Sequence, residues 1–345
     1  KNGGGDDERS VYGQASAAGH PARSSGMCRF WPPPDHATTV VPMAPVEPRI
    51  EPLTVPPAYR AILPRCVSGA TLRSLHSGSP RSSHLIAAAA EIARWNPQLA
   101  NQTLLDFLLS VYAYLKRWHR SDYVYRSAIT TKVLLGRHSP RTARLLPEFR
   151  VWQSKADLVL LNGTSTVYEI KTDYDNLDRL PSQLTDYLRV FDEVYVVAGE
   201  RNHDAIERIA PRRVGILSLS RRFTLHVVRV AESNVDNVDI VAIVDALRRA
   251  EIVAMTRDLC GTVPDVGTGL LHGACRELLE RQSPQDVHGR MVALLKQRRA
   301  PTSSQCRDAP RPLLASYMAS GVPPTQWRGV TASLAATPLA AYLLG

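Results

Sequence analysis

The sequence has few cysteines and few lysines. The first shortage limits the kinds of disulfide and zinc site the protein can have, and the second makes each lysine worth examining. Its five cysteines are far apart, odd in number and free of C-x-x-C spacing. A zinc knuckle or a disulfide framework is therefore not expected, and a reducing cytoplasm is the expected compartment. Only 6 of the 42 basic residues are lysine, so a lysine at a polar site is unusual in this chain.

Long apolar runs and several enzyme motifs are missing as well. No apolar run reaches the roughly 18 to 20 residues that a membrane helix needs, so no membrane association is expected. The absence of a G-x-x-x-x-G-K-[ST] phosphate loop argues against a built-in ATPase motor. There is no G-x-S-x-G motif to indicate a serine hydrolase, and no repeat at the roughly 20 to 50 residue periods of solenoids.

The composition that is present fits a globular protein with a polyanionic partner. The chain has 345 residues, is 44% hydrophobic and carries a net charge of +10. A basic surface gains affinity for nucleic acid by releasing counterions from phosphates. A solvated basic surface without a partner is an equally good explanation of the charge alone.

The pattern divides the chain into five segments. Residues 1–78 are rich in Pro, Gly, Ser and Arg without a sustained period and are expected to be disordered. Residues 79–120 show helical spacing, residues 121–232 form an α/β block that begins with a helix over about 122–135, and residues 233–300 are helical again. Residues 301–345 are expected to form an irregular tail.

The α/β block predicts a mixed sheet covered by helices. Apolar runs and alternating segments predict strands in "EFRVW", "DLVLL", "STVYEIKT", "EVYVVAG", "GILSL" and "FTLHVVRV". Helices are expected over "RLPSQLTDYLRVF" and over about 203–209. A strand, helix, strand order implies a parallel crossover, so we expect an α/β fold with helical additions on both sides of the core.

Three charged residues in the second and third strands stand out. Residues two apart on a strand project from the same face, so Glu169 and Lys171 share a site. A turn at Asn162-Gly163 folds the preceding strand back and brings Asp157 opposite the neighbourhood of Glu169. Charges on a buried sheet are costly unless they are paired or hold a metal.

These residue types suit metal-dependent hydrolysis of phosphodiesters. Two carboxylates repel each other, and a divalent cation between them relieves the repulsion. Mg²⁺ prefers one or two carboxylates together with waters and phosphate oxygens. Lys171 is a compact ammonium in a chain whose basic residues are mostly Arg, and an ammonium is the better group for orienting a nucleophilic water.

At these residues the sequence resembles the PD-(D/E)XK nuclease superfamily. "AD" at 156–157 and "EIK" at 169–171 follow its pattern, with Ala156 in place of the usual proline. Gln183 and Tyr187 are similar to the Q-x-x-x-Y helix motif of its RecB-like branch. The resemblance covers about residues 121–222 and extends to an uncharacterised bacterial family of that superfamily. It implies a restriction-endonuclease-like core.

The resemblance also implies a role for each residue. Asp157 and Glu169 would ligate Mg²⁺ or Mn²⁺, with the backbone carbonyl of Ile170 as a further ligand. Lys171 would orient the attacking water. Gln183 and Tyr187, one helical turn apart, would line the site and contact substrate or the water shell of the metal.

One element of the superfamily pattern is missing. Many members carry an acid on the helix before the first core strand, where this chain has Ser127 and Ala128. Asp122 and Glu148 are poor substitutes by position. The absence speaks against two-metal catalysis and leaves one-metal catalysis open.

The sequence therefore predicts a Mg²⁺-dependent nuclease that acts on nucleic acid, with DNA as the expected substrate. The main alternative is a catalytically silent module of the same fold that binds nucleic acid or a protein partner. A structural subunit with salt-bridged acids is a third possibility. A phosphate-binding rim, or simply a solvated surface, is expected at Arg212, Arg213, Arg221 and Arg222.

Overall fold

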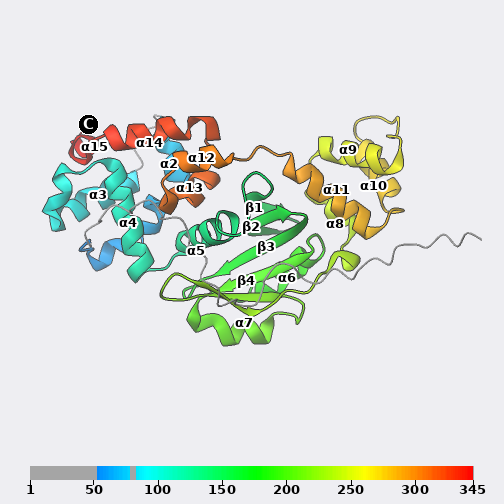
Figure 1. Cartoon of the computed structure of the whole chain (residues 1–345), viewed down its shortest axis with the longest axis horizontal. Coiled ribbons are helices and arrows are strands. Elements are labelled where there is room, and N and C mark those ends of the chain that lie inside the picture. The colour runs from blue at the N-terminus through cyan, green and yellow to red at the C-terminus, as the bar shows by residue number, and fades with distance from the viewer. Residues whose placement is uncertain (1–52, 78–82, 345) are drawn as a thin grey trace, which may run out of the picture. The chain divides into compact units, whose positions relative to one another are not determined.

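The computed structural model of the chain describes residues 53–77 and 83–344 (Figure 1). Its sheet has six strands in the order β1-β2-β3-β4-β5-β6. The pairs of β3 with β4 and of β4 with β5 are parallel and the other three are antiparallel, so the expected mixed sheet is confirmed. The strands are β1 (Arg144–Val151), β2 (Ser154–Asn162), β3 (Thr164–Lys171), β4 (Glu193–Ala198), β5 (Gly215–Leu219) and β6 (Leu225–Arg229).

The β2–β3 hairpin forms with the predicted turn because the turn contains a glycine. Gly163 has a φ of 79°, in the left-handed region that glycine enters without steric cost. The last pair of the β2–β3 ladder is Leu158 with Tyr168. Continuing this register by one residue places Asp157 opposite Glu169, as the sequence predicts.

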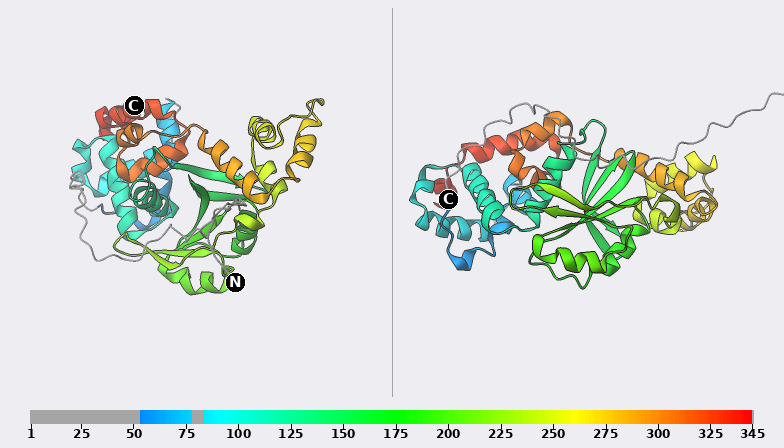
Figure 2. Two further views of the ribbon diagram at one scale, coloured as in Figure 1. Left: turned by 45° about the vertical axis from the view of Figure 1, so that its right-hand side comes forward. Right: turned by 60° about the horizontal axis from the view of Figure 1, so that its bottom comes forward.

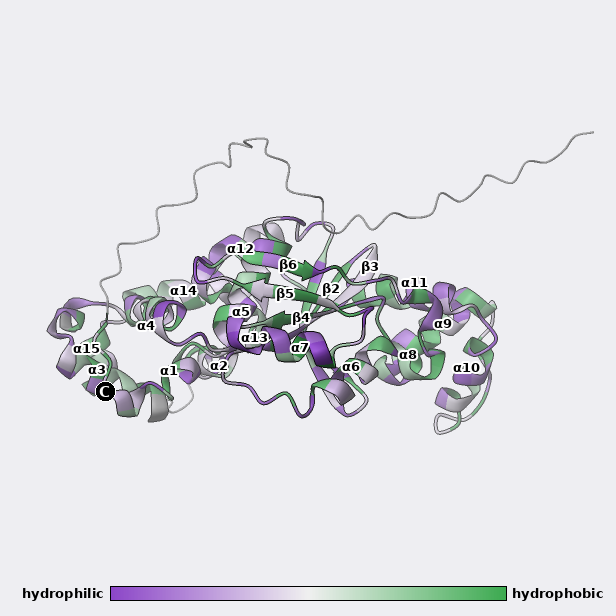
Figure 3. Cartoon of the chain, turned by 90° about the horizontal axis from the view of Figure 1, so that it is seen from below, coloured by the Kyte–Doolittle hydropathy of each residue, from purple (hydrophilic) through white to green (hydrophobic). Residues whose placement is uncertain are grey.

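Two short helices make the parallel crossovers. Helix α6 (Leu180–Leu188) joins β3 to β4, and α7 (His203–Ile209) joins β4 to β5. The α6 residues Leu180, Leu184 and Tyr187 recur at helical spacing and are fully buried in the core that also contains the sheet. Strands β4 and β5 are coloured as hydrophobic in Figure 3, in keeping with their burial.

The predicted helical region after the sheet is confirmed. Its helices pack Ile243, Met255 and Leu295 into the same core as the strands. The short 3-10 turns η4 (Glu200–Asn202) and η5 (Val235–Asn237) lie in the connections. The helices are α8 (Ile240–Ala246), α9 (Arg249–Cys260), α10 (Leu271–Leu279) and α11 (Pro284–Lys296).

Helices also precede the sheet where the sequence predicts them. Helix α4 begins with a capping box in which Thr103 and Asp106 satisfy each other's backbone N–H groups. The segment before the sheet starts as an α-helix and ends in a π-helical turn. These elements are α3 (Ser83–Trp95), η2 (Pro97–Asn101), α4 (Leu104–Trp118), α5 (Asp122–Ile129) and η3 (Thr130–Leu134).

Two expectations of irregular chain are wrong. Residues 53–77 were expected to be disordered but contain helices, and the expected irregular tail after residue 300 is also helical. Residues 1–52 and 78 of the expected disordered segment lie outside the described residues. The elements are η1 (Pro57–Tyr59), α1 (Leu63–Cys66), α2 (Gly69–His76), α12 (Ser303–Asp308), η6 (Arg311–Leu313), α13 (Leu314–Ser320), η7 (Pro324–Gln326), α14 (Trp327–Ala336) and α15 (Leu339–Leu344).

Most of these helices are too short to form on their own, and tertiary packing stabilises them instead. They share a second core with α3 and α4, in which Tyr317 and Trp327 make an edge-to-face contact at 5.5 Å. Helices α2 and α13 pack side by side (Figure 2). The Arg73 guanidinium donates to the Ser320 carbonyl across this contact. Helices α2 and α13 therefore stabilise each other, although more than 230 residues separate them in sequence.

Two sequence exclusions can be checked on the described residues. In residues 53–77 and 83–344, no helix has both the length and the apolar character needed to span a bilayer. The four cysteines in this part of the chain, Cys66, Cys260, Cys275 and Cys306, are free thiols.

Candidate active site

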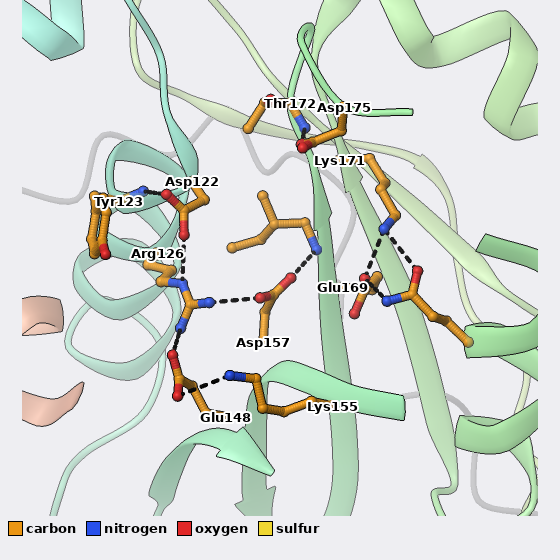
Figure 4. A network of polar contacts seen from close by, with 12 residues as sticks. Asp122, Tyr123, Arg126, Glu148, Lys155, Asp157, Glu169, Lys171, Thr172 and Asp175 are labelled. Atoms are coloured by element: carbon orange, nitrogen blue, oxygen red, sulfur yellow. Dashed lines mark hydrogen bonds and ion pairs between the residues drawn. The ribbon is translucent and has the colours of Figure 1, made fainter. Parts of the chain in front are cut away.

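Glu169 and Lys171 meet on one face of β3, as their spacing predicts. Lys171 Nζ donates to Glu169 Oε1 at 2.9 Å (Figure 4). Both residues are buried, with 2% of Glu169 and 7% of Lys171 exposed. A buried ion pair must have further hydrogen bonds to offset its desolvation.

Helix α6 supplies those hydrogen bonds. Gln183 Nε2 donates to Glu169 Oε1 at 2.7 Å, and Gln183 Oε1 accepts from Lys171 Nζ at 2.8 Å. The Tyr187 hydroxyl, one turn further along the helix, donates to Glu169 Oε2 at 2.8 Å. The two residues of the Q-x-x-x-Y motif therefore hold both the carboxylate and the ammonium, because i and i+4 share a helix face.

This environment raises the pKa of the Glu169 carboxyl toward neutral pH. Burial raises the pKa of its carboxyl to about 7, the Asp157 carboxylate adds to the rise, and Lys171 opposes it. Burial beside Glu169 also raises the pKa of Tyr187, so the phenol stays a hydrogen-bond donor at neutral pH. A second cation near Glu169 would favour the ionised form of the carboxyl.

Asp157 lies at the point where the β2–β3 ladder ends. Its Oδ2 accepts from the backbone N–H of Ile170 at 2.8 Å, so the side chain replaces the missing strand partner. Its Oδ1 accepts from Arg126 Nη2 at 2.7 Å. Burial raises the pKa of Asp157 in spite of these two contacts. Asp157 thus adjoins the Glu169 group through Ile170, while its other oxygen pairs with a cation from α5.

Arg126 is the feature of the site that sequence reasoning missed. Its guanidinium lies 3.3 Å from Asp122 and 3.7 Å from Glu148, in addition to the contact with Asp157 (Figure 4). Only 8% of Arg126 is exposed. Its spacing of four residues from Asp122 is the one signal in the sequence, and it reads as an ordinary pair on a helix surface.

Asp122 and Glu148, the two candidate substitutes for the missing helix acid, both form ion pairs with Arg126. Asp122 and Glu148 direct their carboxylates at Arg126, and Glu148 also pairs with Lys155 at 3.1 Å. Glu148 has a φ of 55°, a conformation that is uncommon for a residue other than glycine. Ser127, at the position where many members of the superfamily carry an acid, is buried and accepts a hydrogen bond from Tyr112.

Asp157, Glu169 and the Ile170 carbonyl are the groups of this site that could hold one magnesium ion. Across the described segments no group of three or more His, Cys, Asp or Glu side chains is arranged to hold a metal. Mg²⁺ needs fewer protein ligands than that, since it keeps several waters. A carboxylate has about four lone-pair sites. Asp157 accepts two hydrogen bonds and Glu169 accepts three, so each carboxylate retains acceptor capacity.

The four arginines expected to form a phosphate-binding rim differ in their contacts and exposure. Arg213 donates to Asn234 Oδ1 at 2.6 Å and thereby ties two loops together. Arg221 is exposed and lies 3.4 Å from Glu200, at a pocket described below. Arg212 and Arg222 are exposed. Their part in binding stays a prediction.

A comparison with known protein families shows the family to which the chain belongs. The profile described as "Bacteriophage P4 protein cII" matches residues 116–311, which is more than half of the chain. The chain belongs to the bacteriophage P4 protein cII family. The matched range contains every residue of the candidate site described above. No solved structure matches the chain, so the restriction-endonuclease-like character of the core stays a prediction.

One relative in the family is protein cII of Enterobacteria phage P4. It is 32% identical over 66 residues, which is 19% of this chain. The aligned stretch spans only a quarter of the length of that relative. The name of the relative describes no chemistry, so the function of the present chain must be argued from the site.

Proposed function

We propose that the chain is a Mg²⁺-dependent nuclease that hydrolyses phosphodiester bonds, in DNA, with a metal-activated water. The observation that carries the proposal is the joint contact of Glu169 with Lys171, Gln183 and Tyr187. Gln183 and Tyr187 reach this pair from the crossover helix at the spacing of the Q-x-x-x-Y nuclease motif. The position of Asp157 beside Ile170 supports the same function.

Each residue of the site has a separate role in the proposed reaction. Asp157, Glu169 and the carbonyl of Ile170 would hold the Mg²⁺, which would supply charge stabilisation and a water of lowered pKa. Lys171 uses two of its three N–H donors on Glu169 and Gln183, which leaves one to orient the water or a phosphate oxygen. Gln183 and Tyr187 fix Glu169 and Lys171 in position. Arg126 anchors Asp157 and takes the place of a second cation.

The proposed partner and compartment follow from the same proposal. A net charge of +10 supports association with a nucleic acid, since basic residues displace counterions from phosphates. Free thiols at all four described cysteines are compatible with a reducing cytoplasm.

Cleavage of defined DNA substrates tests the proposal. Purified protein is incubated with single- and double-stranded DNA in Mg²⁺, in Mn²⁺ and in EDTA, beside Lys171→Ala. We expect metal-dependent cleavage that falls at least about 100-fold in the variant, as for removal of a group that stabilises charge in the transition state. Cleavage that persists unchanged in EDTA or in Lys171→Ala would contradict the proposal.

The pairing of Arg126 with Asp157 favours a second candidate, a silent module that binds nucleic acid without cutting it. An internal guanidinium at 2.7 Å neutralises one of the two carboxylates that a metal would use. Under this alternative the protein binds DNA but cleaves it in neither metal. The same incubation, read by binding as well as by cleavage, separates the two functions.

A further inference from the structure

A basic pocket lined with aromatic side chains lies next to the candidate active site. Its volume is about 340 Å³. It is formed by the end of α4, the loop after β3, the η4 turn and the β5–β6 turn. Asp173 and Tyr174 line it and follow Lys171 by only two and three residues. Three residues of extended chain span at most about 11 Å, so the pocket adjoins the site.

The charge of the pocket suits a polyanion. Five basic and two acidic side chains line it, and the acidic ones are Asp173 and Glu200. Asp173 is already engaged, since its Oδ1 accepts from the backbone N–H of Arg201 at 2.9 Å. Glu200 lies 3.4 Å from Arg221 at the surface. The basic side chains are Lys116, Arg117, Arg120, Arg201 and Arg221.

Two exposed aromatic rings distinguish the pocket from a merely basic surface. Trp118 is 61% exposed and Tyr174 is 60% exposed, although large aromatic side chains are usually buried. The Tyr174 ring stacks on His119, with centroids 4.7 Å apart. Arg117 lies over the Trp118 ring at 5.0 Å. Each ring is therefore supported by a neighbour and still accessible to solvent.

We infer that this pocket binds a single-stranded nucleic acid by stacking unpaired bases on Trp118 and Tyr174. Aromatic platforms combined with a basic groove are the recurring means of holding single strands, because every base has a π-face. A base inside a duplex is covered on both faces by its neighbours and cannot stack on a side chain. Basic side chains that line the pocket contact the phosphates of the bound strand. Because the pocket adjoins Lys171, a single strand is the substrate class we infer for the proposed nuclease, and this inference rests on that function.

Binding in EDTA tests the inference without any cleavage. Fluorescence anisotropy of labelled single-stranded DNA, single-stranded RNA and duplex DNA of equal length gives the affinity of the full chain for each. We expect both single strands to bind more tightly than the duplex. Trp118→Ala and Tyr174→Ala should each bind the better single strand roughly 5- to 100-fold more weakly.

Trp152→Ala is the matched control. Trp152 is 57% exposed and also has an arginine, Arg189, near its ring at 5.2 Å, but it does not line the pocket. It should bind single strands as the wild type does. Arg201→Gln should lower the salt dependence of log affinity by about 0.7 for each phosphate that the variant no longer neutralises.

The outcomes separate this inference from the proposed nuclease. Wild-type affinity in both Trp118→Ala and Tyr174→Ala, or an equal weakening in Trp152→Ala, would overturn the stacking site. Tighter binding of the duplex would also overturn it. Single-strand binding that depends on Trp118 and Tyr174 supports the site even where no cleavage follows in Mg²⁺, a result that would refute only the nuclease.

Discussion

At the scale of single residues, the chemistry of the site depends on how Glu169 is held. The hydroxyl of Tyr187 donates to its Oε2 at 2.8 Å. Tyr187→Phe removes that donor and leaves a buried carboxylate oxygen without it, at a cost of about 1.5–3 kcal/mol. We expect cleavage to fall roughly 10- to 100-fold while the fold is kept, measured by the rate on labelled DNA and by circular dichroism. An unchanged rate would show that Tyr187 is only a core aromatic.

Arg126 carries a prediction about stability. Removing a buried cation leaves its acidic partners uncompensated, so Arg126→Ala should lower the free energy of unfolding by about 3 kcal/mol. Arg189→Ala is the control, because the Arg189–Asp239 pair is about a third exposed on each side and should contribute less than about 1 kcal/mol. Urea unfolding in EDTA and in Mg²⁺ measures both. Mg²⁺ should recover part of the stability in Arg126→Ala, and equal destabilisation of the two variants would contradict this role of Arg126.

Glu193 makes stability depend on pH independently of the candidate site. It is buried, and burial raises the pKa of its carboxyl from 4.5 to about 7, against the opposing hydrogen bond from Thr166. The unfolded chain loses this proton near pH 4.5 and the folded chain near pH 7. The contribution of Glu193 to stability therefore falls between these values, by on the order of 3 kcal/mol.

Glu193→Gln keeps an acceptor for Thr166 and removes the titration. Relative to the wild type, it should be more stable at pH 8 and should lose less stability between pH 5 and pH 8. Urea denaturation at the two pH values gives the comparison, in which the titration of Glu169 is common to both proteins. The same pH dependence in wild type and variant would rule out Glu193 as its source.

At the scale of elements, the sequence correctly predicts the features that depend on local sequence patterns. The β2–β3 turn, the register that places Asp157 opposite Glu169 and the helix that carries Gln183 and Tyr187 all follow from short-range signals. The helices within 53–77 and after residue 300 did not, because all but α14 span only about two turns or fewer and all are stabilised by distant partners. Arg126 was missed for the same reason, since its contacts with Glu148 and Asp157 join segments that are far apart in sequence.

The contact of α2 with α13 carries a prediction at this scale. A Cβ atom at Gly69 would lie 2.7 Å from the backbone carbon and oxygen of Ala319, closer than real contacts allow. Gly69→Ala should therefore destabilise the protein by about 1–3 kcal/mol, as overpacking does. Gly329→Ala is the control, because nothing lies near its Cβ position. Equal melting temperatures for the two variants would mean that this helix contact is not tight.

At the scale of the whole molecule, the segment that matches the family contains the residues of the proposed active site. The family match runs from residue 116 to residue 311 and includes the candidate site, the crossover helix and the residues of the aromatic pocket. The mixed α/β architecture could be predicted from the order of strands and helices. The pocket could not, because Trp118, Tyr174 and Arg221 come together only when the chain folds.

The most direct test of the central claim compares two buried glutamates of the same sheet. Glu169 and Glu193 both have a pKa raised to about 7, but only Glu169 contacts Lys171, Gln183 and Tyr187. The measurement is the rate of Mg²⁺-dependent cleavage of labelled single-stranded DNA by Glu169→Gln and by Glu193→Gln. We predict a decrease of at least about 100-fold for Glu169→Gln and a rate within about twofold of wild type for Glu193→Gln. Equal rates for the two variants, or no cleavage by the wild type, would contradict the claim.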